Sequence, residues 1–427
     1  MKYLYLPQDQ VYWYHHRLPA IKPINDLSVD VAIIGGGMAG LSAAQAFMHR
    51  GKKVALIEQY YCGSGATGKS SGFITPNAEL SLTDFAHHFD VKIAQCIWDL
   101  ITSGVEDIRE NIKTNDFGCD YTEQNTLVVA NSKHALNELE VEHNNLIKLG
   151  YKSAFYDASN VRNHINSNQY FGGVGYEDSF GMNPFLYCQE MKKLLHKNGA
   201  LIYEETPVIE INDHKVITTH GSVNADHIIV CADRFIPQLG FLKKQIYHAQ
   251  TFLMVSERLS DKQISIMFPD DKLMVWDTDL IYTYFRVTGD NRLLLGGGNL
   301  FNTYATSEYH NNIRMTEQLT RYLDNKFPDL KINFLQQWPG LIGISKDLMP
   351  IAGRDHDKTH IYFISAAAGL PIAAALGRYS AEHILDNRND LDDYFSPYRS
   401  FPIGSMLQSL LGTKLSFALS NAITKYF

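Results

Sequence analysis

Apolar residues near the start of the chain come in short runs that are separated by glycines and by one segment of helical spacing. Residues 29–34 form an apolar run that ends in three glycines, which predicts a buried strand of a parallel sheet. Residues 41–50 have the spacing of a helix that stops at Gly51, and residues 53–57 predict a second buried strand. This order predicts a strand–helix–strand unit of an α/β fold.

Helical and strand-like patterns alternate through the middle of the chain. Helical spacing recurs at residues 82–112, 136–149 and 184–198, and strand-like runs occur at residues 121–130, 201–205, 208–211, 215–219 and 227–231. Residues 247–297 are rich in β-branched and aromatic residues, and residues 288–291 offer a hairpin turn between residues 282–287 and 292–295. This stretch predicts an antiparallel sheet. A later helix carries Met315, Leu319 and Tyr322 on one face, and a strand at residues 361–364 precedes a helix at about residues 372–385.

The two ends of the chain have patterns of their own. Residues 1–28 are aromatic and irregular, and Tyr12, Trp13 and Tyr14 are expected to pack on the main body as an arm. Residues 401–427 contain a moderately amphipathic helix, for which a membrane surface and the parent domain are both open as partners. Because Lys414 and Lys425 are its only basic residues, packing on the parent domain is the favoured interpretation.

Length and composition indicate a globular protein of two connected domains. The chain has 427 residues, of which 45% are hydrophobic and 20% are charged. Lysine and arginine number 38 against 46 acidic residues, and this net charge of -8 argues against a nucleic-acid partner. Residues 1–7 show no secretory signal, so a cytoplasmic location is expected. The longest apolar run, residues 361–376, is too short and too interrupted for a transmembrane helix.

Cysteine and histidine usage points away from disulfides and metals. The five cysteines are odd in number and include no Cys-x-x-Cys pair, which predicts reduced thiols. They are Cys62, Cys96, Cys119, Cys188 and Cys231. The doublets His15-His16 and His87-His88 lack the spacing of helical ligands and are interpreted as surface residues. No metal site is predicted.

The first motif with chemical meaning is the glycine turn after the first strand. It has the form G-x-G-x-x-G and comprises Gly35, Gly37, Met38, Ala39 and Gly40. Such a turn lets backbone approach a pyrophosphate, while the helix N-terminus supplies free N–H donors. Glu58 ends the second strand about 20 residues on, where a carboxylate can accept hydrogen bonds from ribose hydroxyls, and Gln59 follows it. These residues predict a dinucleotide site, with FAD and NAD both open.

A second loop of small and hydroxyl residues narrows that choice. It can lie against a flat ring system and offer many backbone N–H groups, although a flexible surface loop is the plainer alternative. At this point the sequence resembles the D-amino-acid oxidase (DAO) family of FAD-dependent oxidoreductases, which carries a similar loop just after its ribose-binding acid. The resemblance assigns to FAD the loop residues Gly65, Ala66, Thr67, Lys69, Ser70, Ser71 and Gly72.

Further segments match this family in the same order along the chain. The resemblance implies that Val208 meets adenine through its backbone and that Cys231 and Ala232 close over the nucleotide. Residues 338–353, which include Gly343, look like a signature near the isoalloxazine. Residues 284–298 are similar to a hairpin of the γ-glutamylputrescine oxidase branch, close to the glycine and sarcosine oxidases.

One segment departs from the family pattern. Where family members usually have a glycine- and histidine-containing turn, residues 366–371 hold one glycine and no histidine. A helix that starts there still points N–H donors at the flavin, so Gly369, Leu370 and Pro371 are assigned to the cofactor. Residues 69–71 and 340–342 contain neither cysteine nor histidine, so FAD is expected to bind non-covalently.

The resemblance implies an enzyme that oxidises the carbon–nitrogen bond of a small amine or amino acid. Hydride would pass to flavin N5, water would hydrolyse the imine, and O2 would take the electrons and yield H2O2. Two alternatives stay open: a dehydrogenase that reduces a quinone or a protein, and a non-catalytic FAD-binding protein. Arg286 is the candidate for binding a substrate carboxylate, with Tyr282 and Tyr284 on the same strand face, although a strand arginine is as often a surface charge.

The predicted architecture is α/β, with a Rossmann-type FAD domain and a substrate domain on a mostly antiparallel sheet. The FAD domain is assembled from residues 28–90, 180–240 and 336–385, and the substrate domain from residues 91–179 and 241–335. Residues 1–27 form the arm, and residues 386–427 form a helical tail. The active site is expected between the two domains, where the isoalloxazine meets the sheet.

Overall fold

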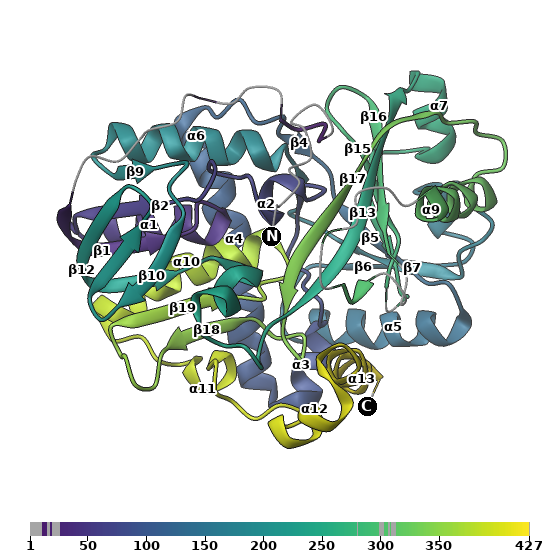
Figure 1. The fold of residues 1–427 in the computed structure, drawn as a ribbon. Helices are drawn as coiled ribbons and strands as arrows, with labels where there is room; N and C mark the ends of the chain where they lie inside the picture. The colour runs from purple at the N-terminus through teal and green to yellow at the C-terminus, as the bar shows by residue number, and fades with distance from the viewer. Residues whose placement is uncertain are drawn as a thin grey trace.

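The fold consists of two halves, each built on a large sheet, that meet along the middle of the molecule (Figure 1). The structure is a computed structural model, and it describes residues 11–14, 18, 26–279, 281–298, 303–305, 308 and 313–426. The first sheet is mostly parallel and the second is mostly antiparallel. This arrangement confirms the predicted fold class.

The first sheet gathers strands from distant parts of the chain. Its order is β10-β11-β12-β1-β2-β9, and β19 and β18 continue it beside β12. The parallel strands are β1 (Leu27–Ile34), β2 (Val54–Ile57), β9 (Leu201–Tyr203), β12 (Gly221–Val230) and β19 (Ile361–Ser365). The antiparallel strands are β10 (Val208–Asn212), β11 (Lys215–Thr218) and β18 (Ile351–Arg354). The carboxyl ends of β1 and β2 therefore lie side by side, which is where parallel sheets bind nucleotides.

Three helices pack closely against one another in this half of the molecule. They are α1 (Met38–His49), α4 (Val91–Asn115) and α10 (Leu370–Asp386). A Cβ on Gly377 of α10 would lie 2.4 Å from the carbonyl oxygen of Ala39, and a Cβ on Gly104 of α4 would lie 2.1 Å from that of Pro371. Glycine at these two positions allows the helix backbones to touch. The other helices of this half are α2 (Ala66–Lys69), α3 (Leu82–His88), α6 (Pro184–Lys197), η3 (Asp233–Leu239) and α11 (Asp392–Phe395).

The second sheet has the order β17-β13-β16-β15-β14-β5-β7-β6. Its strands are β5 (Thr126–Val129), β6 (Ala154–Asp157), β7 (Gly172–Tyr176), β13 (Tyr247–Arg258), β14 (Met274–Asp277), β15 (Tyr284–Val287), β16 (Arg292–Gly297) and β17 (Phe334–Ile344). Neighbouring strands are antiparallel except β14 and β5. Helices α5 (Lys133–Lys148), α7 (Asp261–Met267) and α9 (Ile313–Lys326), with η2 (Val161–Asn163), belong to this half. Met315 and Leu319 of α9 are buried in its core, as the apolar stripe predicts.

A small third sheet and a helical tail complete the fold. The third sheet has the order β3-β8-β4 and consists of β3 (Phe73–Ile74), β8 (Phe180–Gly181) and β4 (Thr122–Glu123). Because β3 follows the predicted flavin loop directly, this sheet joins that loop to strands from the middle of the chain. The tail forms α12 (Ser405–Leu411) and α13 (Thr413–Tyr426), which lie together at the lower edge of the molecule in Figure 1.

Two predicted elements have different bounds in the structure. The helix predicted at residues 82–112 is two helices, because Asp90 caps α4 through its side chain, which accepts the Ile93 N–H at 2.9 Å. The strand predicted from residue 282 begins at Tyr284, because the Asp277 carboxylate takes the Thr283 N–H, 3.3 Å away. The domain boundaries stay predictions. In the structure β17, which includes residue 336, belongs to the second sheet, and α4 packs on α10.

Several other sequence expectations can be compared with the described residues. All five cysteines are free thiols, as predicted. Of the helices in the described ranges, none has the length and apolar content needed to span a bilayer. His87 and His88 are exposed, as expected, whereas His15 and His16 lie outside the described residues. Among the described residues, two groups have side chains capable of holding a metal ion: Asp213, His214 and His360, of which none is buried, and Asp355, His356 and Asp357, of which only Asp355 is buried.

Candidate active site

The glycine turn at the end of β1 forms a tight cradle. Gly35 has φ of +109°, and a Cβ there would lie 2.5 Å from the Cys231 carbonyl oxygen. A Cβ on Gly40 would lie 1.9 Å from the Gly35 carbonyl oxygen, so only glycine lets α1 start this close to the strand. Gly37 is the N-cap of α1 and has no side chain to cap the helix, and the hydroxyl oxygen of Thr67 accepts the Met38 N–H. The next N–H group of α1, at Ala39, lies at the place predicted for a pyrophosphate.

Glu58 follows β2 directly and lies under this turn. One carboxylate oxygen accepts the Gly36 N–H at 2.7 Å, and the other accepts the Tyr60 N–H at 2.9 Å. Burial raises the pKa of Glu58, while these backbone hydrogen bonds oppose the shift. Each carboxylate oxygen can accept more than one hydrogen bond, so Glu58 retains acceptor capacity for ribose hydroxyls. Gln59 is half-buried next to it.

Residues 65–72, which we call the flavin loop, form hydrogen bonds with several distant parts of the chain. Thr67 Oγ1 accepts the Met38 N–H at 3.1 Å, which ties the loop to the start of α1. The indole N–H groups of Trp338 and Trp13 donate to the carbonyl oxygens of Lys69 and Ser70, each at 2.9 Å. The loop includes the short helix α2, which begins at Ala66 after Gly65. These contacts contradict the alternative of a flexible surface loop.

The charged and glycine residues at the end of this loop are also held in place. Lys69 Nζ forms an ion pair with Glu308 at 2.7 Å, and burial lowers the pKa of Lys69. Gly72 has φ of +72°, and its carbonyl oxygen accepts the Met182 N–H at 3.0 Å. The carbonyl oxygen of Ser71 accepts a hydrogen bond from Arg286 at 2.7 Å. The loop is therefore joined to both the first and the second half of the molecule.

The residues predicted on the adenine side lie next to this cradle. The Cys231 N–H donates to the Ile34 carbonyl oxygen at 2.8 Å, and Ala232 follows as the N-cap of η3. Val208 is half-buried at the start of β10. Two residues before it, the Thr206 N–H donates to the Glu58 carbonyl oxygen at 2.9 Å. The structure thus brings the ends of β1, β2 and β12 to one edge of the first sheet, and the segment that leads into β10 reaches this edge through Thr206.

The predicted flavin-side residues come together around Asp233, which the sequence did not single out. One carboxylate oxygen of Asp233 accepts the Gly343 N–H at 2.7 Å, and the other accepts the Ala366 N–H at 3.1 Å. Gly369, with φ of +130°, is the N-cap of α10, and Leu370 and Pro371 form its first turn. No side chain of the described residues caps this helix, and no acidic residue lies in its first turn. Its N–H groups remain available to an electronegative ring atom.

The donor set fits a flavin dinucleotide. The cradle offers two helix N-termini whose N-cap residues are glycines, a buried carboxylate at the ribose position, and glycines whose Cβ atoms would collide with backbone. Anionic phosphates favour the first helix N-terminus, and an electron-rich pyrimidine ring favours the second. The residues of this chain are therefore suited to hold FAD.

A group of aromatic side chains and one carboxylate lies beyond the loop. Four half-buried rings contact one another in a closed circuit, with centroid distances of 5.9 Å for Phe73–Trp276, 6.3 Å for Trp276–Tyr282, 5.8 Å for Tyr282–Tyr284 and 6.0 Å for Tyr284–Phe73. We call these four residues the aromatic group. The Tyr282 hydroxyl donates to a carboxylate oxygen of Glu79 at 2.9 Å. Burial raises the pKa of Glu79, against the opposing effects of Tyr282 and Lys425.

Arg286 lies on the same strand as Tyr284, but its side chain contacts different residues. Its side chain is fully buried and donates to the carbonyl oxygens of Ser71 and Met182, each at 2.7 Å. Tyr282 and Tyr284 belong to the aromatic group, so the structure brings these two tyrosines together and turns Arg286 to the loop. Phe73, Trp276 and Glu79 were missed by the sequence analysis. The only signal for Phe73 was its position directly after the flavin loop.

A model of the family of FAD-dependent oxidoreductases, DAO, matches residues 30–383. The chain belongs to the DAO family. It is 26% identical to the gamma-glutamylputrescine oxidoreductase of Escherichia coli over 90% of each chain, and 25% identical to the probable oxidoreductase OrdL of Haemophilus influenzae over 93% of this chain and 92% of the relative. The crystal structure of glycine oxidase from Geobacillus kaustophilus has the same fold, with a TM-score of 0.75, 17% identity and coverage of 88% of this chain and all of that one.

Membership in the DAO family confirms two predictions. The protein is an enzyme, an FAD-dependent oxidoreductase, and its cofactor is FAD. The non-catalytic alternative is therefore wrong. The roles predicted for individual residues stay predictions, and the geometry above shows which of them lie together.

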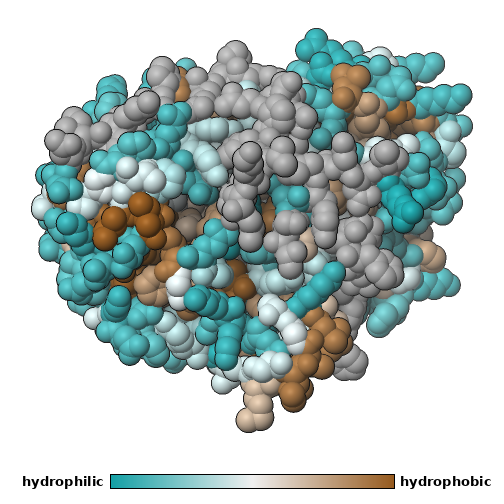
Figure 2. Space-filling view, viewed as in Figure 1, coloured by the Kyte–Doolittle hydropathy of each residue, from teal (hydrophilic) through white to brown (hydrophobic). Residues whose placement is uncertain are grey.

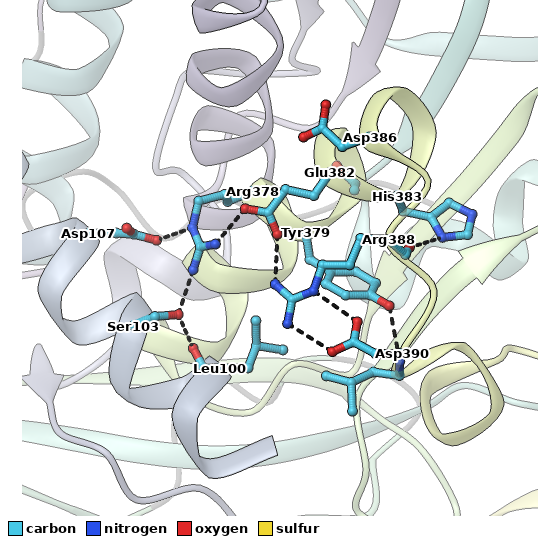
Figure 3. Close-up of polar contacts among 12 residues, drawn as sticks. Leu100, Ser103, Asp107, Arg378, Tyr379, Glu382, His383, Asp386, Arg388 and Asp390 are labelled. Atoms are coloured by element: carbon cyan, nitrogen blue, oxygen red, sulfur yellow. Dashed lines mark hydrogen bonds and ion pairs between the residues drawn. The ribbon is translucent and has the colours of Figure 1, made fainter. Parts of the chain in front are cut away.

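In this DAO-family chain, a network of ion pairs in the second half of α10 holds that helix on α4 (Figure 3). Arg378 of α10 donates to Asp107 and Ser103 of α4, at 2.7 and 2.5 Å, and to Glu382 at 2.6 Å. Glu382 also accepts from Arg388 at 2.8 Å, after the end of α10. Together with the glycine contact at Pro371, this network fixes α10 on α4, and so fixes where its N-terminus points.

Proposed function

We propose that this enzyme oxidises the carbon–nitrogen bond of a small amine that carries a positively charged group. The observation that carries the proposal is the aromatic group with the Glu79 carboxylate at its edge. Aromatic faces attract cations with about 0.5–2 kcal/mol per favourable contact. A carboxylate beside them supplies the opposite charge, so this part of the molecule suits an ammonium group better than a carboxylate.

The placement of Arg286 supports the same choice. An arginine that binds a substrate carboxylate needs its donors free to form a bidentate pair. The Arg286 side chain is instead buried, and two of its nitrogens donate to backbone carbonyl groups. We therefore assign Arg286 to holding the flavin loop, and Tyr282, Tyr284 and Glu79 to substrate binding.

The names of the relatives support an amine or amino acid as the substrate class. They include a gamma-glutamylputrescine oxidoreductase and a glycine oxidase, and solved structures with the same fold include an L-amino acid deaminase from Proteus vulgaris. Each of these names refers to a compound in which an oxidisable carbon is bonded to an amine nitrogen. We extend this class to the present chain and narrow it to amines with a cationic group.

The protein contributes binding, orientation and electrostatics. FAD, when bound, supplies the acceptor for the hydride that leaves the carbon next to nitrogen. Glu79 and the aromatic group hold the cationic part of the substrate and so orient the carbon that loses hydride. The N-terminus of α10 stabilises negative charge at the flavin side of the site. Water hydrolyses the resulting imine after release, so the mechanism needs no nucleophilic side chain.

We further propose that FAD binds non-covalently. No cysteine or histidine occurs at residues 69–71 or 340–342, and the thiol of Cys231, at the glycine turn, has its pKa raised by burial. Acid precipitation should release all of the flavin into the supernatant. Yellow colour that stays with the precipitate would contradict this assignment.

The decisive experiment is anaerobic reduction of the purified holoenzyme, followed by the bleaching of its visible absorbance. The panel contains a diamine, the same diamine acetylated at one nitrogen, and a neutral amino acid. We expect the diamine to bleach the flavin fastest and the acetylated amine at least about tenfold more slowly, since one cation contact of about 1.4 kcal/mol corresponds to that factor. Fast reduction by the amino acid alone would favour a carboxylate site instead.

The same preparation identifies the electron acceptor. We propose O2, with H2O2 as the reduced product. Peroxide should form in air in a one-to-one ratio with the amine oxidised. Slow peroxide formation combined with rapid reoxidation by a soluble quinone would identify a dehydrogenase.

A further inference from the structure

The two helices at the end of the chain expose their apolar side chains and bury their polar ones. The exposed side chains are Met406 at 84%, Leu407 at 47%, Leu410 at 80%, Leu415 at 48%, Leu419 at 42% and Ile423 at 43% exposure. The buried ones, apart from Phe417, are polar and include Gln408, Ser416, Ser420, Asn421 and Thr424. A helix that only packs on its parent domain turns its apolar stripe inward. Helices α12 and α13 do the opposite.

Hydrogen bonds to the body of the protein fix this orientation. Asn421 of α13 donates to the carbonyl oxygens of Ser345 and Lys346, each at 2.9 Å, and accepts from the Tyr304 hydroxyl at 3.0 Å. For α12, the buried Lys346 ammonium donates to Gln408 Oε1 at 3.0 Å. Turning either helix to hide its apolar side chains would leave these buried groups without partners, which is unfavourable. The outward direction of the apolar residues is therefore specified by the sequence.

The exposed residues form one patch, which we call the tail patch: Met406, Leu407, Leu410, Leu415, Leu419 and Ile423. Leu415, Leu419 and Ile423 follow one another at intervals of four and so form a stripe along α13. Figure 2 shows apolar side chains gathered at the lower edge of the molecule, where Figure 1 places α12 and α13. Exposed apolar patches of this kind mark contacts with a protein or a membrane.

The segment that carries the tail patch differs in charge from the whole chain. Residues 394–427 contain no aspartate or glutamate, although the whole chain has 46 acidic residues and a net charge of -8. Arg399 and Lys425 pair with Asp347 and Asp84, whereas Lys414 is exposed between the two helices. Salt screens charges beyond about 8–10 Å, so a surface that touches the patch responds mainly to Lys414.

We propose that the tail patch is a docking surface for a lipid bilayer that contains anionic lipids. The two helices would lie in the plane of the interface, with Met406 and Leu410 at the boundary of the acyl chains and Lys414 among the phosphates. A second copy of the chain fits less well, because Met406 is the one patch residue of a type that protein interfaces favour, and the patch has no aromatic or arginine side chain. The proposal goes beyond the proposed function and requires nothing of the substrate.

The test is flotation of the full-length, FAD-loaded enzyme with vesicles of phosphatidylcholine, with and without phosphatidylglycerol. Wild type should float with the mixed vesicles. The double variants Met406→Ser/Leu410→Ser and Leu415→Ser/Leu419→Ser should each bind at least about tenfold less. Lys414→Gln should weaken binding to the mixed vesicles by about fivefold and leave binding to pure phosphatidylcholine unchanged. Leu335→Ser, at an equally apolar position that is 61% exposed on β17, is the matched control and should bind like wild type.

Flavin absorbance and the melting temperature show that each variant is folded. A measurement on wild type alone makes the test independent of variants: vesicles should slow amide hydrogen exchange in α12 and α13 and leave β16 unchanged. The proposal is overturned if wild type stays with the soluble fraction, or if the double variants float as well as wild type. It is also overturned if wild type is a dimer that the same substitutions dissociate, without any vesicle binding.

Discussion

Arg286 Nε donates to the carbonyl oxygen of Ser71 at 2.7 Å, which links the second sheet to the flavin loop. A second nitrogen of the same guanidinium donates to the Met182 carbonyl oxygen, also at 2.7 Å. Burial lowers the pKa of Arg286 to about 10, and the backbone carbonyl dipoles stabilise its charge. The planar fork of the side chain, rather than its charge alone, fixes the position of the loop.

Replacing Arg286 by lysine should therefore weaken FAD binding. Lysine keeps the charge but cannot span both carbonyl groups, and each buried group left without a partner costs about 1–3 kcal/mol. We expect the dissociation constant of FAD to rise at least about tenfold, measured by quenching of flavin fluorescence. Arg292→Lys on the neighbouring strand is the control. Unchanged FAD affinity, with a raised KM for a carboxylate-bearing amine, would return Arg286 to a role in substrate binding.

Protonation of the Glu79 carboxylate should lower kcat/KM on the acidic side of the pH profile. We call this part of the profile the acidic limb. Burial raises its pKa above the ordinary value, and only the ionised form attracts a cation. For a substrate with a permanently charged ammonium group, kcat/KM should fall as pH drops through that raised pKa and stay level above it. Glu79→Gln should remove this limb and lower kcat/KM at neutral pH by about tenfold.

Tyr282→Phe is the matched variant for this measurement. The Tyr282 hydroxyl lowers the pKa of Glu79 by donating to it, so its removal should move the acidic limb to higher pH while the aromatic ring remains. A limb at the same pH in wild type, Glu79→Gln and Tyr282→Phe would exclude Glu79 as its source.

Asp233 should be important for stability and for FAD retention. Its carboxylate accepts the N–H groups of Gly343 and Ala366, two segments that are far apart in sequence. Asp233→Ala should lower the free energy of unfolding by about 1–3 kcal/mol in urea denaturation, and FAD should dissociate at lower urea concentration. The control is Asp226→Ala, because Asp226 is exposed on β12. Equal effects of the two substitutions would show that Asp233 has no special role.

The buried ion pair between Lys192 and Glu204 allows a second test of stability. The two side chains are 3% and 0% exposed and lie 2.9 Å apart, and Glu204 also accepts the Cys62 N–H at 2.8 Å. Lys192→Met leaves a buried carboxylate without its cation and should cost about 3–5 kcal/mol. The double variant Lys192→Met/Glu204→Gln should be more stable than Lys192→Met, as measured by the melting temperature. If it is less stable, the charge of Glu204 is not the source of the loss.

Gly377 is predicted to tolerate no side chain. A Cβ there would lie 2.4 Å from the Ala39 carbonyl oxygen, so alanine forces α10 away from α1. Gly377→Ala should cost about 1–3 kcal/mol in stability and weaken FAD binding, because the N-termini of α1 and α10 are both predicted to contact the cofactor. Gly118→Ala, where no atom lies within 4 Å of the added Cβ, should be close to neutral in both measurements.

The parts of the fold that could be predicted are those determined by local sequence. The first strand, its glycine turn, the helix and the second strand follow from periodicity and from turn chemistry, and the structure places them as predicted. Asp233 and Glu79 were missed because their roles depend on contacts with residues far away in sequence. Tyr282 was predicted to lie inside a strand, whereas the strand begins at Tyr284. The alternation of side chains along the sequence cannot reveal that the Asp277 side chain replaces a hydrogen bond of the sheet at Thr283.

The buried ammonium of Lys346 has a consequence for folding during synthesis. Its acceptors are the Ile403 carbonyl oxygen, at 2.9 Å, and Gln408, which follow it by 57 and 62 residues in the chain. During synthesis this cation has neither partner until those residues have left the ribosome, and it must stay in contact with water. A nascent chain stalled before residue 403 should therefore not reach the native core.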